Sequence, residues 1–205
     1  MNKEDFFQTD GVLAQNDKYI LATLTEADKE NYLKLYRENS MVAKASSKMS
    51  DVDYDEFAEF VWEKLSEEDA IYVSVFLKTD LTYVGNIVMQ HPFSDIPEIG
   101  IDVLKRYQRK GIAYDTIPMF AKRVLEVKII EYFLVRIYSD NIASANLLEK
   151  LGALRIGHEL SELGAVLAQM KEKQKDEYEE LLTRNPDVEE IANKNCIVQY
   201  RYLPE

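Results

Sequence analysis

The 205-residue sequence contains very little cysteine and histidine. Its one cysteine is Cys196, and its two histidines are His91 and His158. A disulfide needs a second cysteine, while zinc sites and cysteine–histidine nucleophile pairs need clusters of these side chains. The sequence therefore gives little support for a disulfide framework, a metal site or a thiol nucleophile. Any catalysis has to use carboxylates, tyrosines, serines or backbone groups.

Long hydrophobic runs, repeats and low-complexity tracts are also absent. No stretch approaches the roughly 20 consecutive apolar residues that a membrane-spanning helix needs, and residues 1–10 carry charges. We therefore expect a cytoplasmic protein. No Pro-rich or Gly/Ser-rich linker divides the chain, and 46% of the residues are hydrophobic. We expect residues 1–205 to form one domain with a sizeable core.

Positive charge is scarce: 25 lysines and arginines stand against 37 acidic residues, for a net charge of -12. Such a surface repels nucleic-acid backbones and anionic membranes, so we expect neither as a partner. An amine-bearing, cationic substrate is easier to reconcile with this charge. An acidic surface can also serve solubility alone.

Hydrophobic periodicity predicts a mixed α/β (α+β) fold. Segments typical of strands lie at residues 18–24, 71–78, 83–90, 98–104, 130–138, 154–158 and 196–203. Helical periodicity covers residues 25–37, 53–65, 111–127, 142–151 and 163–182. Thr25 and Asp28 form a capping pattern, and Gly152 suits a left-handed helix end. This order predicts a mostly antiparallel sheet of about seven strands flanked by helices.

The most informative segment is EIGIDVLKRYQRKGIA, residues 98–113, which leads from a strand through a basic loop into a helix. Unpaired N–H groups at a helix N-terminus attract anions. Arg106, Arg109 and Lys110 add positive charge beside them, and Gly111 allows close approach to the backbone. The segment therefore predicts a phosphate or diphosphate site, although such a loop can also be a solvated connection.

Two motifs resemble one known family. Residues 108–113, QRKGIA, match the pattern Q/R-x-x-G-x-G/A of the pyrophosphate loop in the GNAT N-acetyltransferases, and Val103 stands where that family prefers an aliphatic residue. Residues 141–153, NIASANLLEKLGA, are similar to a later helix of the same family. The resemblance covers about residues 71–153 and is strongest to the RimJ/RimL-like branch, whose members acetylate protein N-termini and assorted small amines.

The resemblance implies a GNAT fold and transfer of the acetyl group of acetyl-coenzyme A to a primary amine by direct attack in a ternary complex. The amine would belong to a protein N-terminus or a small molecule. The implied coenzyme A contacts are the main chain of Ile101 and Val103, the loop residues Gln108, Arg109, Lys110, Gly111, Ile112 and Ala113, and the later Asn141 and Asn146.

The catalytic groups are less clearly marked. Glu98 begins the strand before the loop and is the first candidate for the base that takes the amine proton, with Asp102 on the same face as a second. Glu98 can equally be a solvated strand end. Many family members have a tyrosine acid where this sequence has Leu148. Ser144 is the nearest substitute, with a helix cap as its alternative role, and Tyr138 is a further candidate.

Residues 163–193 have no counterpart in the minimal family pattern, and we interpret them as a helical insertion. Its apolar stripe is expected to pack on its own domain, with a homodimer contact as the alternative. Residues 39–52 would contribute to acceptor specificity. Two other functions stay open: a non-catalytic acetyl-coenzyme A sensor or docking module, suggested by Leu148, and a toxin-like or drug-modifying acetyltransferase.

Overall fold

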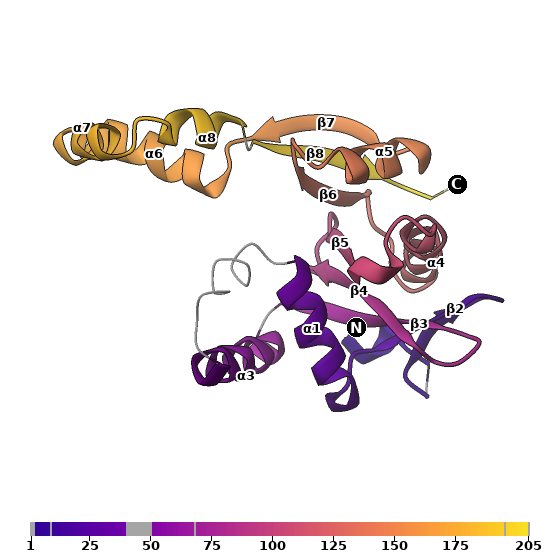
Figure 1. Cartoon of the computed structure of the whole chain (residues 1–205). Coiled ribbons are helices and arrows are strands. Elements are labelled where there is room, and N and C mark those ends of the chain that lie inside the picture. The colour runs from indigo at the N-terminus through magenta and orange to yellow at the C-terminus, as the bar shows by residue number, and fades with distance from the viewer. Residues whose placement is uncertain (1–2, 9, 40–50, 68, 195, 205) are drawn as a thin grey trace. The chain divides into compact units, whose positions relative to one another are not determined.

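The structure, a computed structural model, describes residues 3–8, 10–39, 51–67, 69–194 and 196–204. Most of the segment expected to influence acceptor specificity, residues 40–50, lies outside these ranges. Contacts divide the chain into two compact units, residues 1–133 with 204–205 and residues 134–203. The first unit contains the basic loop, and the second contains the later helix (Figure 1).

The first unit is built on an antiparallel sheet. Its strands, in spatial order, are β1 (Val12–Gln15), β2 (Tyr19–Thr23), β3 (Ala70–Leu77), β4 (Tyr83–Gln90) and β5 (Glu98–Val103). Each pairs antiparallel with the next. The helical segments are η1 (Lys3–Phe6), η2 (Glu26–Asp28), α1 (Lys29–Asn39), α3 (Asp51–Glu67), η4 (Lys105–Tyr107) and α4 (Ile112–Val127).

Helices cover both faces of this sheet, with α1 and α4 on different sides (Figure 1). Because side chains alternate along a strand, each strand supplies residues to both faces. On the α1 side, Leu35 packs with Tyr83 and Leu104. On the other side α4 packs against β1, β2 and β5. The five α4 residues that its periodicity predicts to be buried are buried, together with Thr116: Ile112, Ile117, Phe120, Ala121 and Val124.

The predicted capping pattern before α1 is confirmed. One carboxylate oxygen of Asp28 accepts hydrogen bonds from the Thr25 N–H at 2.9 Å and the Thr25 hydroxyl at 3.1 Å. The same oxygen accepts the hydroxyl of Ser74 on β3 at 3.2 Å. Asp28 therefore both starts the helical segment and fixes it to the face of the sheet that α1 covers.

The second unit contains β6 (Phe133–Tyr138) from its second residue onward, α5 (Ile142–Lys150), β7 (Leu154–Glu159) and β8 (Ile197–Tyr202). β8 lies between β6 and β7 and pairs antiparallel with β7. Alternate residues Val198, Tyr200 and Tyr202 of β8 are buried. Gly152 ends α5 with a φ of 77°, and the Ala153 N–H bonds back to the Leu148 carbonyl, so the predicted left-handed end is confirmed.

The single long helix predicted for residues 163–182 is wrong. The structure has α6 (Glu162–Lys173), α7 (Lys175–Arg184) and α8 (Val188–Lys194) instead. Gln174 leaves the helical conformation with φ of −141° and ψ of 58°. The break lets the apolar residues meet one another: Leu167, Tyr178 and Ala192 form a small core with Met170, Leu181, Leu182 and Val188.

The predicted fold class is confirmed: helices flank mostly antiparallel strands, of which the described residues contain eight rather than about seven. The strand that the prediction missed is β1, whose four residues, VLAQ, are too few to show a period. One domain over residues 1–205 stays a prediction. None of the helices within the described ranges is long and apolar enough to cross a membrane.

Candidate active site

The N–H and C=O groups of β5 point alternately toward β4 and away from it. The Leu104 N–H bonds to the Val84 carbonyl at 3.0 Å, and Val103 stands opposite Gly85. In an antiparallel pair, successive residues direct their N–H and C=O groups alternately toward and away from the partner strand. The main-chain groups of Ile101 and Val103 therefore point away from β4.

Side chains from two other elements meet the Val103 carbonyl. The Gln108 side-chain amide donates to it at 2.9 Å, and the Asn39 amide donates to it at 3.2 Å. Gln108 also donates to the Asn39 side-chain oxygen at 3.4 Å. Next to Asn39 in α1, the Glu38 carboxylate accepts the Lys105 N–H at 2.8 Å. The predicted ligand residue Gln108 thus ties the loop to β5 and to the end of α1.

The loop enters α4 through two left-handed residues. Arg109 has a φ of 61° and Gly111 has a φ of 82°. Gly111 is the N-cap and offers no side chain, so no capping hydrogen bond reaches the first N–H groups of α4. A Cβ added at Gly111 would meet no atom within 4 Å. Open space therefore adjoins N–H groups that favour an anion.

Cationic side chains are held beside this loop by an aromatic ring. The Arg106 guanidinium lies 4.8 Å and the Lys110 ammonium 5.1 Å from the centroid of the Tyr107 ring. Cation–π contacts of this kind restrain both charges. Tyr107 itself packs against the cluster of Leu35 and Leu104. The loop is consequently a local region of positive charge in an acidic protein.

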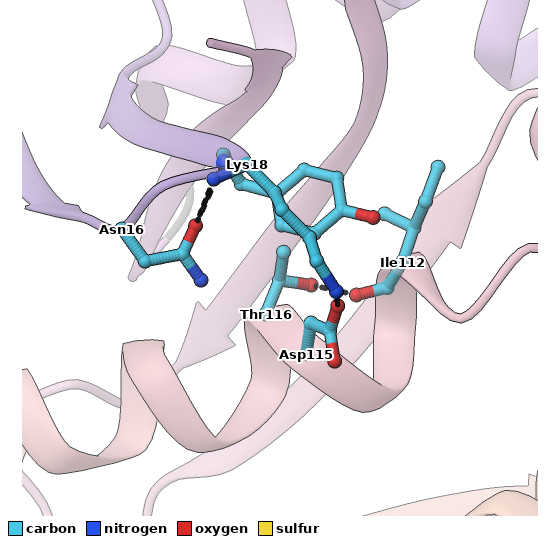
Figure 2. A network of polar contacts seen from close by, with 6 residues as sticks. Asn16, Lys18, Ile112, Asp115 and Thr116 are labelled. Atoms are coloured by element: carbon cyan, nitrogen blue, oxygen red, sulfur yellow. Dashed lines mark hydrogen bonds and ion pairs between the residues drawn. The ribbon is translucent and has the colours of Figure 1, made fainter.

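The first turn of α4 also carries an acidic residue, and a lysine from the β1–β2 turn pairs with it. The Lys18 ammonium lies 3.0 Å from the Asp115 carboxylate (Figure 2). Asn16 accepts the Lys18 N–H at 2.8 Å, and the Thr116 hydroxyl donates to the Ile112 carbonyl at 2.8 Å. The hydrogen bond to Asp115 raises the pKa of Lys18. Lys18 therefore offsets a charge that would oppose an anion at this helix end.

A row of polar residues crosses the α1 face of the sheet. Ser74 stands opposite Asn86, and Asn86 stands opposite Asp102. Asn86 is 5% exposed, and its amide nitrogen has no hydrogen-bond partner among the described residues. The Asp102 carboxyl keeps access to solvent, yet the protein on its other sides removes part of its hydration and raises its pKa. On this face of the sheet, the exposed Asp102 with its raised pKa therefore stands opposite a buried amide.

Tyr83 lies in the same polar region. It is 3% exposed, and within the described chain its hydroxyl has no partner. Burial, with Tyr32, Asp28 and Asp102 nearby, raises the pKa of the Tyr83 phenol. The sequence prediction missed Tyr83 and Asn86. A signal existed, because an asparagine interrupts the otherwise apolar segment YVGNIVM, and a buried polar residue needs an explanation.

Glu98, the first candidate base, begins β5 opposite Gln90 and is partly exposed. It shares the face of Asp102, as predicted from alternation. Four strand residues separate the two positions by about 13 Å. The two carboxylates therefore occupy different places along the strand, and one acceptor nitrogen cannot contact both at once.

The other predicted residues belong to the second unit. Asn141 caps α5, because its side-chain oxygen accepts the Ser144 N–H at 3.1 Å. The alternative role of Ser144 as the cap is therefore wrong. Tyr138 ends β6 and is 43% exposed, and Asn146 lies exposed on α5. Leu148, at the family's tyrosine position, is buried at 3% exposure.

Comparison with known families gives one match. Residues 18–154, more than half of the chain, match the family described as acetyltransferase (GNAT) domain. The matched range contains the basic loop and the whole of α5 with its flanking residues. No curated protein gives a match.

Solved structures resemble the fold at low sequence identity. A chimera of spermidine N-acetyltransferase SpeG from Vibrio cholerae and hSSAT has a TM-score of 0.61 at 13% identity, over 90% of this chain and 95% of that one. The SpeG complex with CoA and spermine has a TM-score of 0.57 at 17% identity, over 72% and 87%. A putative ribosomal-protein-serine acetyltransferase from Vibrio cholerae has a TM-score of 0.54 at 17% identity, over 73% and 87%. Similarity at these identities concerns the fold.

Proposed function

Because this chain belongs to the family of acetyltransferase (GNAT) domains, we propose that it transfers the acetyl group of acetyl-coenzyme A to a primary amine by direct attack in a ternary complex. It is an acyltransferase, and the acceptor that we propose is a small-molecule amine or a protein N-terminus. The observation that carries this proposal is the anchored basic loop, which opens onto the uncapped N-terminus of α4.

The loop suits the diphosphate of coenzyme A. Main-chain N–H groups from Arg109 to Ala113 would donate to the phosphate oxygens, and Gly111 leaves room for them. Arg106 and Lys110 add charge without having to be ordered anew, because Tyr107 already holds both. The Gln108 side chain supports the loop through its bond to Val103.

The main-chain groups of β5 that point away from β4 suit the pantetheine arm. Amide groups of that arm can pair with the main chain of Ile101 and Val103 as a further strand would. The Val103 carbonyl already accepts two side-chain donors, so we assign the Val103 contact to its N–H. Once bound, acetyl-coenzyme A supplies an activated thioester, and a backbone N–H would polarise its carbonyl.

Four residues of the second unit also have proposed roles. Asn141 and Asn146 are proposed coenzyme A contacts. Because the Asn141 side-chain oxygen caps α5, we assign the ligand contact to its amide N–H₂ group. Ser144 and Tyr138 are the proposed donors to the leaving thiolate, and both carry a hydroxyl that is at least partly exposed.

The net charge of the chain and the similar solved structures support the choice of acceptor. SpeG structures are described as spermidine N-acetyltransferases, and another similar structure as a putative ribosomal-protein-serine acetyltransferase. We propose a cationic amine of one of these two kinds, which fits a net charge of -12. Assignment to the RimJ/RimL-like branch and a cytoplasmic location belong to the same proposal.

A second function is favoured by one observation. Leu148 is buried where many family members have their general acid. A non-catalytic module that binds acetyl-coenzyme A as a sensor would need no acid.

Turnover separates the two functions. Purified protein is incubated with acetyl-coenzyme A and a panel containing spermidine, spermine and peptides with free N-termini, and free thiol is followed with the acetylated product. We expect release with at least one amine. Tight binding without release across the panel would favour the sensor, and a protein that neither binds nor reacts would refute both.

A further inference from the structure

The polar row on the α1 face leads beyond the proposed activity to the residue that receives the acceptor's proton. Asp102 is the residue between Ile101 and Val103, whose main-chain groups point away from β4. Its side chain projects to the α1 face, while the neighbouring backbone is the proposed ligand contact. Among the described residues of β5, it is the carboxylate nearest to those contacts, since Glu98 lies about 13 Å further along the strand.

Asn86 is the immediate cross-strand neighbour of Asp102. Directly opposite residues on one sheet face have Cβ atoms about 5 Å apart, within reach of a side-chain hydrogen bond. The Asn86 amide nitrogen is buried and has no acceptor within the described part of the chain. A buried donor without an acceptor is unfavourable, so its presence in an apolar strand points to a function.

We infer that Asp102 is the carboxylate that binds the acceptor ammonium and takes its proton, and that the Asn86 amide, which is unpaired within the described ranges, positions this carboxylate by donating to it in the ternary complex. The inference rests on the proposed acetyl transfer and deepens it. It assigns the base to Asp102 instead of Glu98, and it limits the acceptor to amines whose nitrogen approaches from the α1 face of β5.

The charges around Asp102 fit a cationic ligand. Tyr83 of β4 interacts electrostatically with Asp102, and also with Tyr32 of α1 and Asp28 of η2. Glu98 lies further along the same face of β5, and Glu38 of α1 lies beside Lys105 just after the strand. Glu38 is already bonded to the Lys105 N–H. Partial loss of hydration raises the pKa of Asp102, and a raised pKa makes the carboxylate a better proton acceptor. An ammonium group would supply the missing countercharge.

The proton balance of the step is complete. Asp102 takes one proton from the ammonium, which frees the nitrogen lone pair. The nitrogen attacks the thioester carbonyl carbon, the C–N bond forms and the C–S bond breaks, and the electron pair leaves on sulfur. The second N–H proton neutralises the thiolate, so the products are the acetylated amine, coenzyme A as its thiol and one proton passed from Asp102 to water.

The test compares Asp102→Asn with Glu98→Gln, two matched carboxylate-to-amide changes on one face of one strand. The pH profile of kcat/KM is measured for the amine that the wild type acetylates best. We expect Asp102→Asn to lower kcat/KM by about 10²- to 10⁴-fold and to remove the acidic limb of the profile. Asp102→Glu should restore part of the rate. The loss in Glu98→Gln should be at least tenfold smaller.

Asn86→Leu tests the positioning role. A hydrogen bond to the charged carboxylate lowers its pKa, so loss of the donor should move the acidic limb of the kcat profile, which reports the enzyme–substrate complex, to higher pH. The melting temperature should not fall, because leucine replaces a buried unpaired amide. An unmoved limb would overturn the role of Asn86.

The results of these experiments distinguish a wrong choice of base from a wrong proposed function. A wild type that acetylates an amine, with an Asp102→Asn variant that keeps the parental acidic limb or loses no more than Glu98→Gln, overturns the assignment of the base alone. A wild type without turnover on any amine contradicts the acetyl transfer itself, and the assignment with it.

Discussion

Gln108 of the loop has a structural role that the sequence motif does not indicate. Gln108 belongs to a ligand pattern, yet its side chain donates to the Val103 carbonyl and to Asn39. The loop conformation, with a positive φ at Arg109 and Gly111, is therefore fixed from β5 and α1. A loop that is already ordered loses less conformational entropy when a ligand binds, so binding is more favourable.

Gln108→Leu keeps the size of the side chain and removes its donor. One net hydrogen bond is worth about 0.5–1.5 kcal/mol, so we expect acetyl-coenzyme A to bind roughly 3- to 10-fold more weakly. Gln169→Leu, an exposed change on α6, is the control. Calorimetric titration of both variants measures the difference, and equal affinities would show that the bond does not shape the loop.

Asp102 gives a prediction for stability against pH. Its pKa is raised in the folded protein, so between the ordinary carboxyl pKa and the raised one the folded state binds more protons than the unfolded state. Stability from this group is highest at low pH and falls as pH rises through that interval. Asp102→Asn should therefore have a higher urea midpoint than the parent at pH 7, with the gap closing near pH 4. A lower midpoint at pH 7 would contradict a desolvated Asp102.

At the scale of elements, β4 and β5 approach closely beside the proposed pantetheine contact. A Cβ added at Gly85 would lie 2.3 Å from the Asp102 carbonyl oxygen and 3.2 Å from the Val103 Cα. Both are backbone atoms, so the two strands would have to separate. Gly85 thus sets the position of the strand that carries Asp102.

Gly85→Ala should destabilise the first unit by about 1–3 kcal/mol, the usual cost of overpacking. Gly100→Ala on the facing strand is the matched control, because its added Cβ would meet only the Val88 side chain at 3.4 Å. Melting temperatures of the two variants report the difference. Similar values would mean that β4 can shift without cost.

Much of the element pattern could be predicted from sequence, because local physics determines it. The periodicity of α4, the Thr25–Asp28 cap and the glycine at the end of α5 are local signals, and the structure confirms each. The break at Gln174 was not predictable, because no proline or glycine marks it. It depends on contacts between Leu167 and residues further along the chain.

The candidate site was predictable only in part for the same reason. Gln108 and Gly111 stand in a contiguous motif, whereas Asn86 and Tyr83 meet Asp102 through strand register and a bulge between β3 and β4. Register is a tertiary property that a periodic pattern does not specify.

The insertion core provides a stability prediction with an internal control. Leu167 is 5% exposed and packs with Tyr178 and Ala192, while Leu163 on the same helix is 40% exposed. Leu167→Ala should cost about 2–5 kcal/mol in this helical segment, and Leu163→Ala much less. Hydrogen exchange of α6 to α8 measures both. Equal protection would show that this core does not stabilise the insertion.

At the scale of the whole molecule, two electrostatic effects oppose each other. The net charge of -12 repels polyanionic coenzyme A, while Arg106, Lys110 and the start of α4 attract it locally. The local charges would act on bound coenzyme A at a few ångströms, whereas charges further away than the Debye length of about 8–10 Å are largely screened at physiological salt. The local attraction should therefore dominate.

Salt screens both effects, and the two losses change the affinity for coenzyme A in opposite directions. If local attraction dominates, the Kd for acetyl-coenzyme A rises as NaCl is raised from 50 mM to 500 mM at fixed pH. Isothermal titration at several salt concentrations measures the slope. Binding that tightens with salt would mean that the overall acidic field controls the encounter.

The most direct test of the account is calorimetric titration of acetyl-coenzyme A into the wild type, Gly111→Leu and Gly152→Leu. Both glycines have a positive φ, and an added Cβ at either would meet no protein atom within 4 Å. The two changes therefore impose a similar backbone strain. The account predicts that the wild type binds, that Gly111→Leu loses at least tenfold in affinity, and that Gly152→Leu keeps the wild-type value. No binding by the wild type, or equal losses in both variants, would contradict a coenzyme A site at this loop.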